Sequence, residues 1–102
     1  MKKIINGKKY DTETAKMLGE TWEGARNDFN FWREELYKKR TGEFFIYGEG
    51  GANSRYSEYI PEANAYAGGE EIRPISEAEA KKWCETHLSV DEYEAIWGVV
   101  EE

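Results

Sequence analysis

The sequence contains one cysteine, one histidine and two prolines in 102 residues. Because Cys84 has no second cysteine to pair with, the chain forms no intramolecular disulfide, and nothing in it argues for secretion. One histidine and one cysteine cannot complete a structural zinc centre, and the carboxylates lack the spacing of an EF-hand loop. We therefore expect neither a metal nor a cofactor.

Long apolar segments are missing as well. No run approaches ~18 apolar residues, and the N-terminus lacks the apolar core of a signal peptide. We expect a cytoplasmic protein that makes no membrane contact. A chain of 102 residues has room for one core, so residues 1–102 are predicted to form a single domain.

Basic residues are outnumbered in a chain of net charge −7, and the two signs are unevenly placed. The first ten residues hold four lysines and no acid, whereas the segment from Ser76 to the end holds eight acids against Lys81 and Lys82. Such a field repels nucleic acid from the C-terminal side and attracts basic protein surfaces. Solubility is the alternative explanation for the same charge.

Strand-forming sequence surrounds Gly42. Phe44–Tyr47 is the most apolar run of the chain, and together with Glu35–Lys39 it predicts a central β-hairpin. Asn6-Gly7 predicts a smaller hairpin within Lys2–Tyr10, because this dipeptide favours two-residue hairpin turns.

Between and beyond these hairpins the pattern is less uniform. Phe29–Glu34 fits a helix or a strand, and the glycine-rich segment Gly48–Gly69 is a long loop that is functional, mobile or conceals an element. The other expected elements are a helix over Thr12–Leu18 that Asp11 caps and Gly19 ends, a strand over Glu20–Glu23, a polar loop over Gly24–Asn30 and an edge strand over Glu71–Ile75 with Pro74.

The C-terminal segment predicts two helices. Ser76 and Ser89 each begin a capping box, and the second helix ends at Gly98. The expected buried positions are Ala80, Trp83, Cys84 and Leu88 in the first helix and Val90, Tyr93, Ile96 and Trp97 in the second. We predict an α+β fold, in which these helices cover one face of a small twisted antiparallel sheet.

Two patterns bear on chemistry, and a structural reading is favoured for both. Cys84 and His87 have the spacing of a pair on one helical face, but Cys84 lies in the apolar stripe. Gly48–Gly51 follows a strand as a phosphate-binding loop does, yet Glu49 interrupts it and no lysine follows. We expect no catalytic residue.

Three segments carry a resemblance to known proteins: Ile4–Ala15, Leu36–Gly51 and the helix start Ser76–Ala80. They resemble a group of small, mostly uncharacterised proteins of Gram-positive gut bacteria and their phages and mobile elements. The Leu-Tyr…Thr-Gly-Glu…Gly-Glu-Gly-Gly string is the most specific part. The resemblance implies no activity. It implies a setting in which small acidic accessory proteins inhibit host defence, anti-CRISPR proteins among them.

These features predict a non-enzymatic protein-binding inhibitor of anti-CRISPR or anti-defence type. It would engage a basic surface of a CRISPR effector or another defence nuclease. The expected contacts are Tyr56, Tyr59, Glu85, Asp91, Glu92 and Glu94. The alternative is a nucleic-acid-binding or regulatory accessory protein that uses basic hairpin tips and stacking tyrosines. Its candidate residues are Lys8, Lys9, Lys38, Lys39 and Arg40, with Tyr10 and Tyr37.

Overall fold

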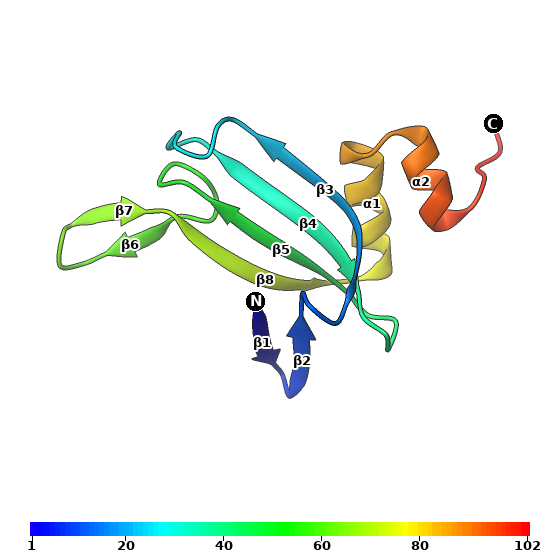
Figure 1. Cartoon of the computed structure of the whole chain (residues 1–102), viewed down its shortest axis with the longest axis horizontal. Coiled ribbons are helices and arrows are strands. Elements are labelled where there is room, and N and C mark those ends of the chain that lie inside the picture. Colours follow the sequence, from blue (N-terminus) through cyan, green and yellow to red (C-terminus); the bar gives the residue numbers. More distant parts are fainter.

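The structure is a computed structural model that describes residues 1–102, and a four-stranded antiparallel sheet forms its centre. The sheet runs in the order β3-β4-β5-β8, with β3 at Lys16–Glu23, β4 at Trp32–Lys38, β5 at Phe44–Gly50 and β8 at Gly69–Ile75 (Figure 1). The other elements are β1 (Lys2–Ile5) paired with β2 (Lys8–Asp11), β6 (Glu58–Ile60) paired with β7 (Ala65–Ala67), α1 (Glu77–His87) and α2 (Val90–Trp97). The predicted α+β class is confirmed.

Both predicted hairpins are present. Lys38 pairs with Phe44 at the end of the β4–β5 hairpin, and Gly42 has the positive φ of 94° that its turn requires. Asn6 and Gly7 have φ of 51° and 78°, as expected of a two-residue turn between β1 and β2. The ambiguous segment before the central hairpin is a strand from Trp32 onward.

The helix predicted over Thr12–Leu18 is wrong. The Asp11 carboxylate accepts a hydrogen bond from the Glu13 amide, but the turn ends at Ala15 and β3 begins at Lys16. Pairing with β4 decides the outcome, and a register shift between Met17 and Gly19 marks a bulge in this ladder. Gly19 is therefore not a helix stop. It lies inside β3 and faces the Leu88 side chain, which a Cβ at position 19 would approach to 2.9 Å.

The long glycine-rich segment does conceal an element. Its first residues complete β5, and its second half forms the β6–β7 hairpin, which projects from one end of the molecule (Figure 1). The predicted edge strand is confirmed as part of β8. Pro74 lies opposite Phe45 in this edge strand. The outer side of an edge strand has no neighbouring strand, so it tolerates a proline, which has no backbone N–H to donate.

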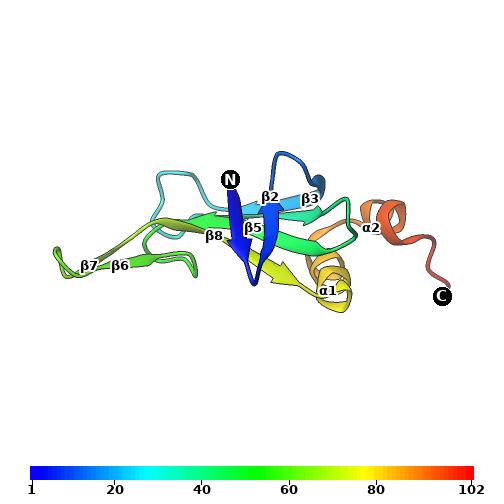
Figure 2. The same cartoon turned by 90° about the horizontal axis from the view of Figure 1, so that it is seen from below.

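The sheet separates two apolar clusters. One lies under α1 and contains Leu36, Phe44, Ile46, Ala80, Trp83 and Cys84. The other lies under the β1–β2 hairpin and contains Tyr10, Tyr37, Phe45, Tyr47 and Ile72. The clusters lie on opposite faces of the sheet because they contain alternate residues of β4 and β5, and Figure 2 shows α1 below the sheet.

Both helices begin as predicted, with complete capping boxes at Ser76 and Ser89. The second helix packs less deeply than expected. It lies past the end of the sheet, where the Trp97 ring packs 5.4 Å from the Phe44 ring, and none of its side chains is fully buried. Val90 is 73 % exposed, so its predicted place in the buried face is wrong.

Candidate functional site

The junction of α1 and α2 forms an apolar groove with acidic residues at its edge. The Leu88 amide ends α1 by donating to the Cys84 carbonyl at 2.9 Å, and Ser89 caps α2 immediately afterwards. Two helices joined this closely leave a hollow between them and the C-terminal tail. The lining residues are Cys84, Glu85, Leu88, Ser89, Val90, Tyr93, Glu94 and Val100.

The C-terminal tail forms one wall of this groove. Gly98 ends α2 with a φ of 95°, a conformation that L side chains rarely adopt. The chain then turns back, and the Val100 amide donates a hydrogen bond to Glu94 Oε2 at 2.8 Å. Val99 and Val100 remain 85 % and 58 % exposed, so the tail presents apolar surface beside the groove.

The carboxylates around the groove are not neutralised by cations. All seven ion pairs of the structure lie between residues 8 and 73, which leaves Glu85 and Asp91 exposed and unpaired. Glu92 accepts a hydrogen bond from the Ser89 amide at 3.0 Å, which lowers the pKa of its carboxyl and keeps it ionised. Of the predicted acids, Glu85 and Glu94 line the groove, and Asp91 and Glu92 lie in the first turn of α2. We call these four acids together with the groove the acidic helical end.

The two tyrosines predicted to act with these acids lie elsewhere. Tyr56 is only 4 % exposed, so its side chain is not the surface anchor that the sequence suggested. Tyr59 is 49 % exposed and packs 5.3 Å from Tyr66 on the β6–β7 hairpin. This hairpin and α2 lie at opposite ends of the molecule, so Tyr59 shares no surface with the acidic helical end (Figure 1).

Tyr56 is buried because it completes the surroundings of Glu34, a residue that the sequence analysis did not single out. The Glu34 carboxylate accepts hydrogen bonds from the Tyr56 hydroxyl and from Trp83 Nε1, the latter at 2.9 Å, and Arg73 lies 4.0 Å away. These contacts join β4, the loop before β6, β8 and α1. A buried carboxylate with such partners is a structural clamp.

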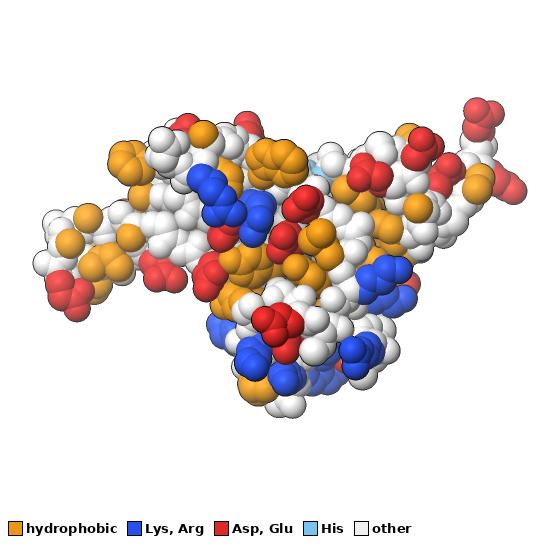
Figure 3. All heavy atoms as spheres, viewed as in Figure 1, with side chains coloured by type: hydrophobic (Ala, Val, Ile, Leu, Met, Phe, Trp, Pro, Cys, Tyr) orange, Lys and Arg blue, Asp and Glu red, His pale blue; other side chains and the backbone are white.

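The basic hairpin tips lie side by side, but the predicted cations do not all meet on one face. The Lys39 ammonium lies 4.2 Å from the centre of the Tyr10 ring, whereas that of Lys38 lies 5.5 Å from the centre of the Phe44 ring in the other cluster. Lys8 and Lys39 both reach Glu43, at 3.3 and 3.4 Å, so the β1–β2 hairpin lies beside the β4–β5 turn. Figure 3 shows Lys and Arg side chains gathered in this region. However, Tyr10 and Tyr37 are 6 % and 8 % exposed, so their expected stacking role is wrong.

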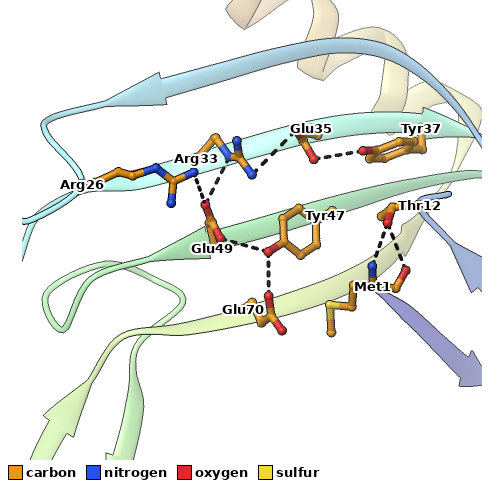
Figure 4. Close-up of polar contacts among 9 residues, drawn as sticks. All are labelled: Met1, Thr12, Arg26, Arg33, Glu35, Tyr37, Tyr47, Glu49 and Glu70. Carbon is orange, nitrogen blue, oxygen red and sulfur yellow. Dashed lines mark hydrogen bonds and ion pairs between the residues drawn. The ribbon is translucent and has the colours of Figure 1, made fainter.

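A polar network crosses the sheet face that carries β1–β2 (Figure 4). Tyr47 donates toward Glu70 at 2.6 Å and lies 3.0 Å from Glu49, which also pairs with Arg33 at 3.3 Å. Burial and these carboxylates raise the pKa of the Tyr47 hydroxyl, which therefore stays protonated as a donor. The network links neighbouring strands, and its charged groups are occupied with one another. It therefore offers no free nucleophile.

Neither chemical pattern of the sequence is assembled into a reactive site. Cys84 is fully buried, and burial raises the pKa of its thiol. The His87 ring packs 5.0 Å from the ring of Trp83. In the glycine-rich run, the Gly51 amide donates to the Phe31 carbonyl at 2.8 Å and is not available to a phosphate.

No family model, curated protein or solved structure matches this chain. Neither helix has the length and apolar character needed to cross a membrane. No group of three or more His, Cys, Asp or Glu side chains is arranged to hold a metal ion.

Proposed function

We propose that the protein is a non-enzymatic protein-binding inhibitor that docks its acidic helical end on a basic surface of its partner. The observation that carries this proposal is the combination of an exposed apolar groove with two carboxylates, Glu85 and Asp91, that have no structural partner; Glu92 and Glu94 form hydrogen bonds within the chain. Glu85 and Glu94 border a groove that contains Leu88, Val90 and Tyr93. Carboxylates without a structural partner remain free to meet cations of another molecule.

The apolar component supports binding rather than solubility alone. A purely solubilising surface needs charge, but it does not need valines 73 % and 85 % exposed, as Val90 and Val99 are, beside the acids. Burying such side chains supplies affinity, while the surrounding charges guide approach and select the partner. The β6–β7 hairpin and Tyr59 lie outside this interface.

The partner class follows from charge complementarity and from the resemblance of the sequence. A surface that binds nucleic acid presents Lys and Arg to phosphates, and exposed carboxylates on two adjoining helices compete for the same cations. The proteins that the sequence resembles belong to Gram-positive gut bacteria and their phages and mobile elements. Host defence nucleases act against such elements, so they are the expected targets of an inhibitor. The proposed partner is therefore the nucleic-acid-binding surface of a CRISPR effector or another defence nuclease.

Charge reversal tests this proposal at two exposed acids that form no ion pair or hydrogen bond within the chain, and the melting temperature of each variant is measured alongside, because Asp91 lies in the first turn of α2. The test variant carries Glu85→Lys and Asp91→Lys, which alter neither a capping box nor the Glu94 contact with the tail. The matched control carries Glu58→Lys and Glu62→Lys on the exposed β6–β7 hairpin and changes net charge equally. Binding to purified RNA-guided nucleases, and inhibition of their DNA cleavage, are measured at several salt concentrations.

The test variant is expected to bind at least about tenfold more weakly at low salt, because each reversed charge meets a cation of the partner. The control should bind and inhibit like the unaltered chain, and affinity should fall as salt rises. Equal losses in both variants, or binding that does not respond to salt, would contradict docking through the acidic helical end. Absence of binding to every nuclease tested would overturn the anti-defence assignment.

A further inference from the structure

Two lysines face each other directly in the sheet. They lie at the end of the sheet farthest from the β6–β7 hairpin. Lys16 of β3 and Lys38 of β4 are cross-strand partners, and neither forms an ion pair with an acid. Like charges directly opposite one another destabilise a sheet. An anion held between them would remove this repulsion.

The two lysines line a shallow hollow that is rich in cations. Its walls are formed by Thr14, Ala15, Lys16, Lys38, Lys39 and Arg40. Only Lys39 has an acidic partner there, namely Glu43 at 3.4 Å. Lys16, Lys38 and Arg40 form no ion pair. The Lys38 ammonium lies 5.5 Å from the centre of the Phe44 ring, which leaves its charge without an anionic partner.

Further cations surround this hollow. The β1–β2 hairpin lies beside it, since Lys8 reaches Glu43 at 3.3 Å. We call the hollow and the adjoining β1–β2 turn the basic end; its cations are Lys8, Lys9, Lys16, Lys38, Lys39 and Arg40, and its acids are Asp11 and Glu43. The acids are partly occupied, because Glu43 bridges two lysines and Asp11 lies 4.0 Å from Lys9. A strongly positive surface therefore persists on a chain of net charge −7.

We propose that the basic end binds the phosphodiester backbone of double-stranded nucleic acid, with the Lys16–Lys38 hollow holding one phosphate. A row of lysines and an arginine at several positions suits a ligand with regularly spaced charges. Single strands are bound largely through exposed aromatic rings, but Tyr10 and Tyr37 are buried here. The contacts are to phosphates only, so binding is independent of sequence. This site is separate from the acidic helical end and does not depend on its function.

Three cations of the hollow can be removed without breaking an ion pair. The test variant carries Lys16→Gln, Lys38→Gln and Arg40→Gln. The matched control carries Arg55→Gln, Lys81→Gln and Lys82→Gln, which remove three cations that are likewise free of ion pairs but lie outside the basic end. Fluorescence anisotropy of a labelled mixed-sequence DNA duplex is measured with the full chain between about 50 and 200 mM salt.

The test variant is expected to raise the Kd for the duplex at least about tenfold and to lower the slope of log K against log salt by about 2 to 3. The control should change the Kd by less than about twofold. The melting temperature of the test variant should stay close to that of the unaltered chain, because the relief of repulsion between Lys16 and Lys38 offsets the lost contact of Lys38 with the Phe44 ring. That result shows that lost binding does not reflect lost folding.

Four outcomes would overturn the proposal: no duplex binding by the unaltered chain at low salt, equal losses in test variant and control, tighter binding to a single strand of the same sequence, or complete competition by inorganic phosphate at concentrations near the protein's own. The last two would assign the basic end to a different ligand. Each readout is independent of nuclease binding, so failure here leaves the acidic helical end untouched.

Discussion

The ring of Tyr56 lies against the backbone of Gly48, in the space that a Cβ at position 48 would occupy. This close approach allows the Tyr56 hydroxyl to reach Glu34, whose other oxygen accepts the Trp83 indole N–H at 2.9 Å. A glycine inside a strand therefore makes room for a clamp between the sheet and α1. The clamp fixes the helix from which the acidic helical end extends.

The Gly48→Ala substitution is predicted to destabilise the fold by about 2 kcal/mol or more, because the new Cβ displaces the Tyr56 ring. In a Tyr56→Ala background the same substitution should cost less than about 1 kcal/mol, since the ring is gone. Urea unfolding of the two single variants and the double variant measures this coupling. Additive effects would show that the two residues do not compete for space.

The Glu34→Gln substitution should lower the free energy of unfolding by about 1–3 kcal/mol. The Nε2 group of the amide is a donor, so it cannot replace the carboxylate oxygen that accepts a hydrogen bond from Tyr56 or Trp83. Glu71→Gln on the exposed edge strand β8 is the control and should change stability by less than about 0.5 kcal/mol. Equilibrium urea unfolding gives both values. Equal stability of the two variants would mean that the clamp contributes little.

Local signals in the sequence predicted much of the fold. Asn6-Gly7 and Gly42 specify turns through their backbone conformations, and the capping boxes at Ser76 and Ser89 specify helix starts, so both kinds of element could be recognised within a few residues. Thr12–Leu18 was mispredicted because its strand exists only through pairing with β4. Long-range pairing leaves no mark in a short window.

The candidate site was predictable in part for the same reason. The acids of α2 were found because they belong to a helix with a recognisable start. Tyr56 was misplaced because its burial depends on Gly48, eight residues earlier and on a different element. The separation of Tyr59 from α2 follows from the sheet topology. Local sequence patterns did not predict this topology. A glycine inside the most apolar strand was the one available sign of the Tyr56 contact.

Alkaline pH should weaken the fold through Tyr56. Burial and the adjacent Glu34 raise the pKa of this hydroxyl from 10.0 to about 12, so the folded state holds its proton more tightly than the unfolded state. The resulting stability is complete below about pH 10 and is lost as pH rises toward 12; a two-unit shift corresponds to about 2.7 kcal/mol.

The Tyr56→Phe variant isolates this contribution. The difference in unfolding free energy between the unaltered chain and the variant should shrink by about 2 kcal/mol between about pH 9 and pH 12, because the unaltered chain alone loses the tyrosine contribution. Urea unfolding at matched pH values provides the comparison. A constant difference across this range would contradict a raised pKa at Tyr56.

Cys84 should react slowly with thiol reagents in the native protein. Its side chain is fully buried, and burial raises the pKa of the thiol, so little thiolate is present or accessible. Alkylation by iodoacetamide near neutral pH should proceed at less than about 1 % of the rate in the urea-unfolded chain. Native reactivity close to the unfolded rate would instead support a Cys84–His87 nucleophile.

The apolar part of the proposed interface is tested at Val90. Its side chain is 73 % exposed, so Val90→Gln should leave the melting temperature nearly unchanged. The variant should nevertheless dissociate from a bound nuclease several times faster, because an apolar contact of the complex is lost. Surface plasmon resonance measures the dissociation rate of each variant from the immobilised nuclease. An unchanged dissociation rate would place Val90 outside the interface.

The acidic helical end is tested most directly by titrating the isotope-labelled full chain with a short amphipathic peptide of Leu and Lys and following backbone amide NMR shifts. The account predicts shifts confined to the groove, at Leu88, Val90, Tyr93 and Val100, which weaken as salt rises and are absent with a peptide of Leu and Glu. Shifts centred on the β6–β7 hairpin, or equal responses to both peptides, would contradict it.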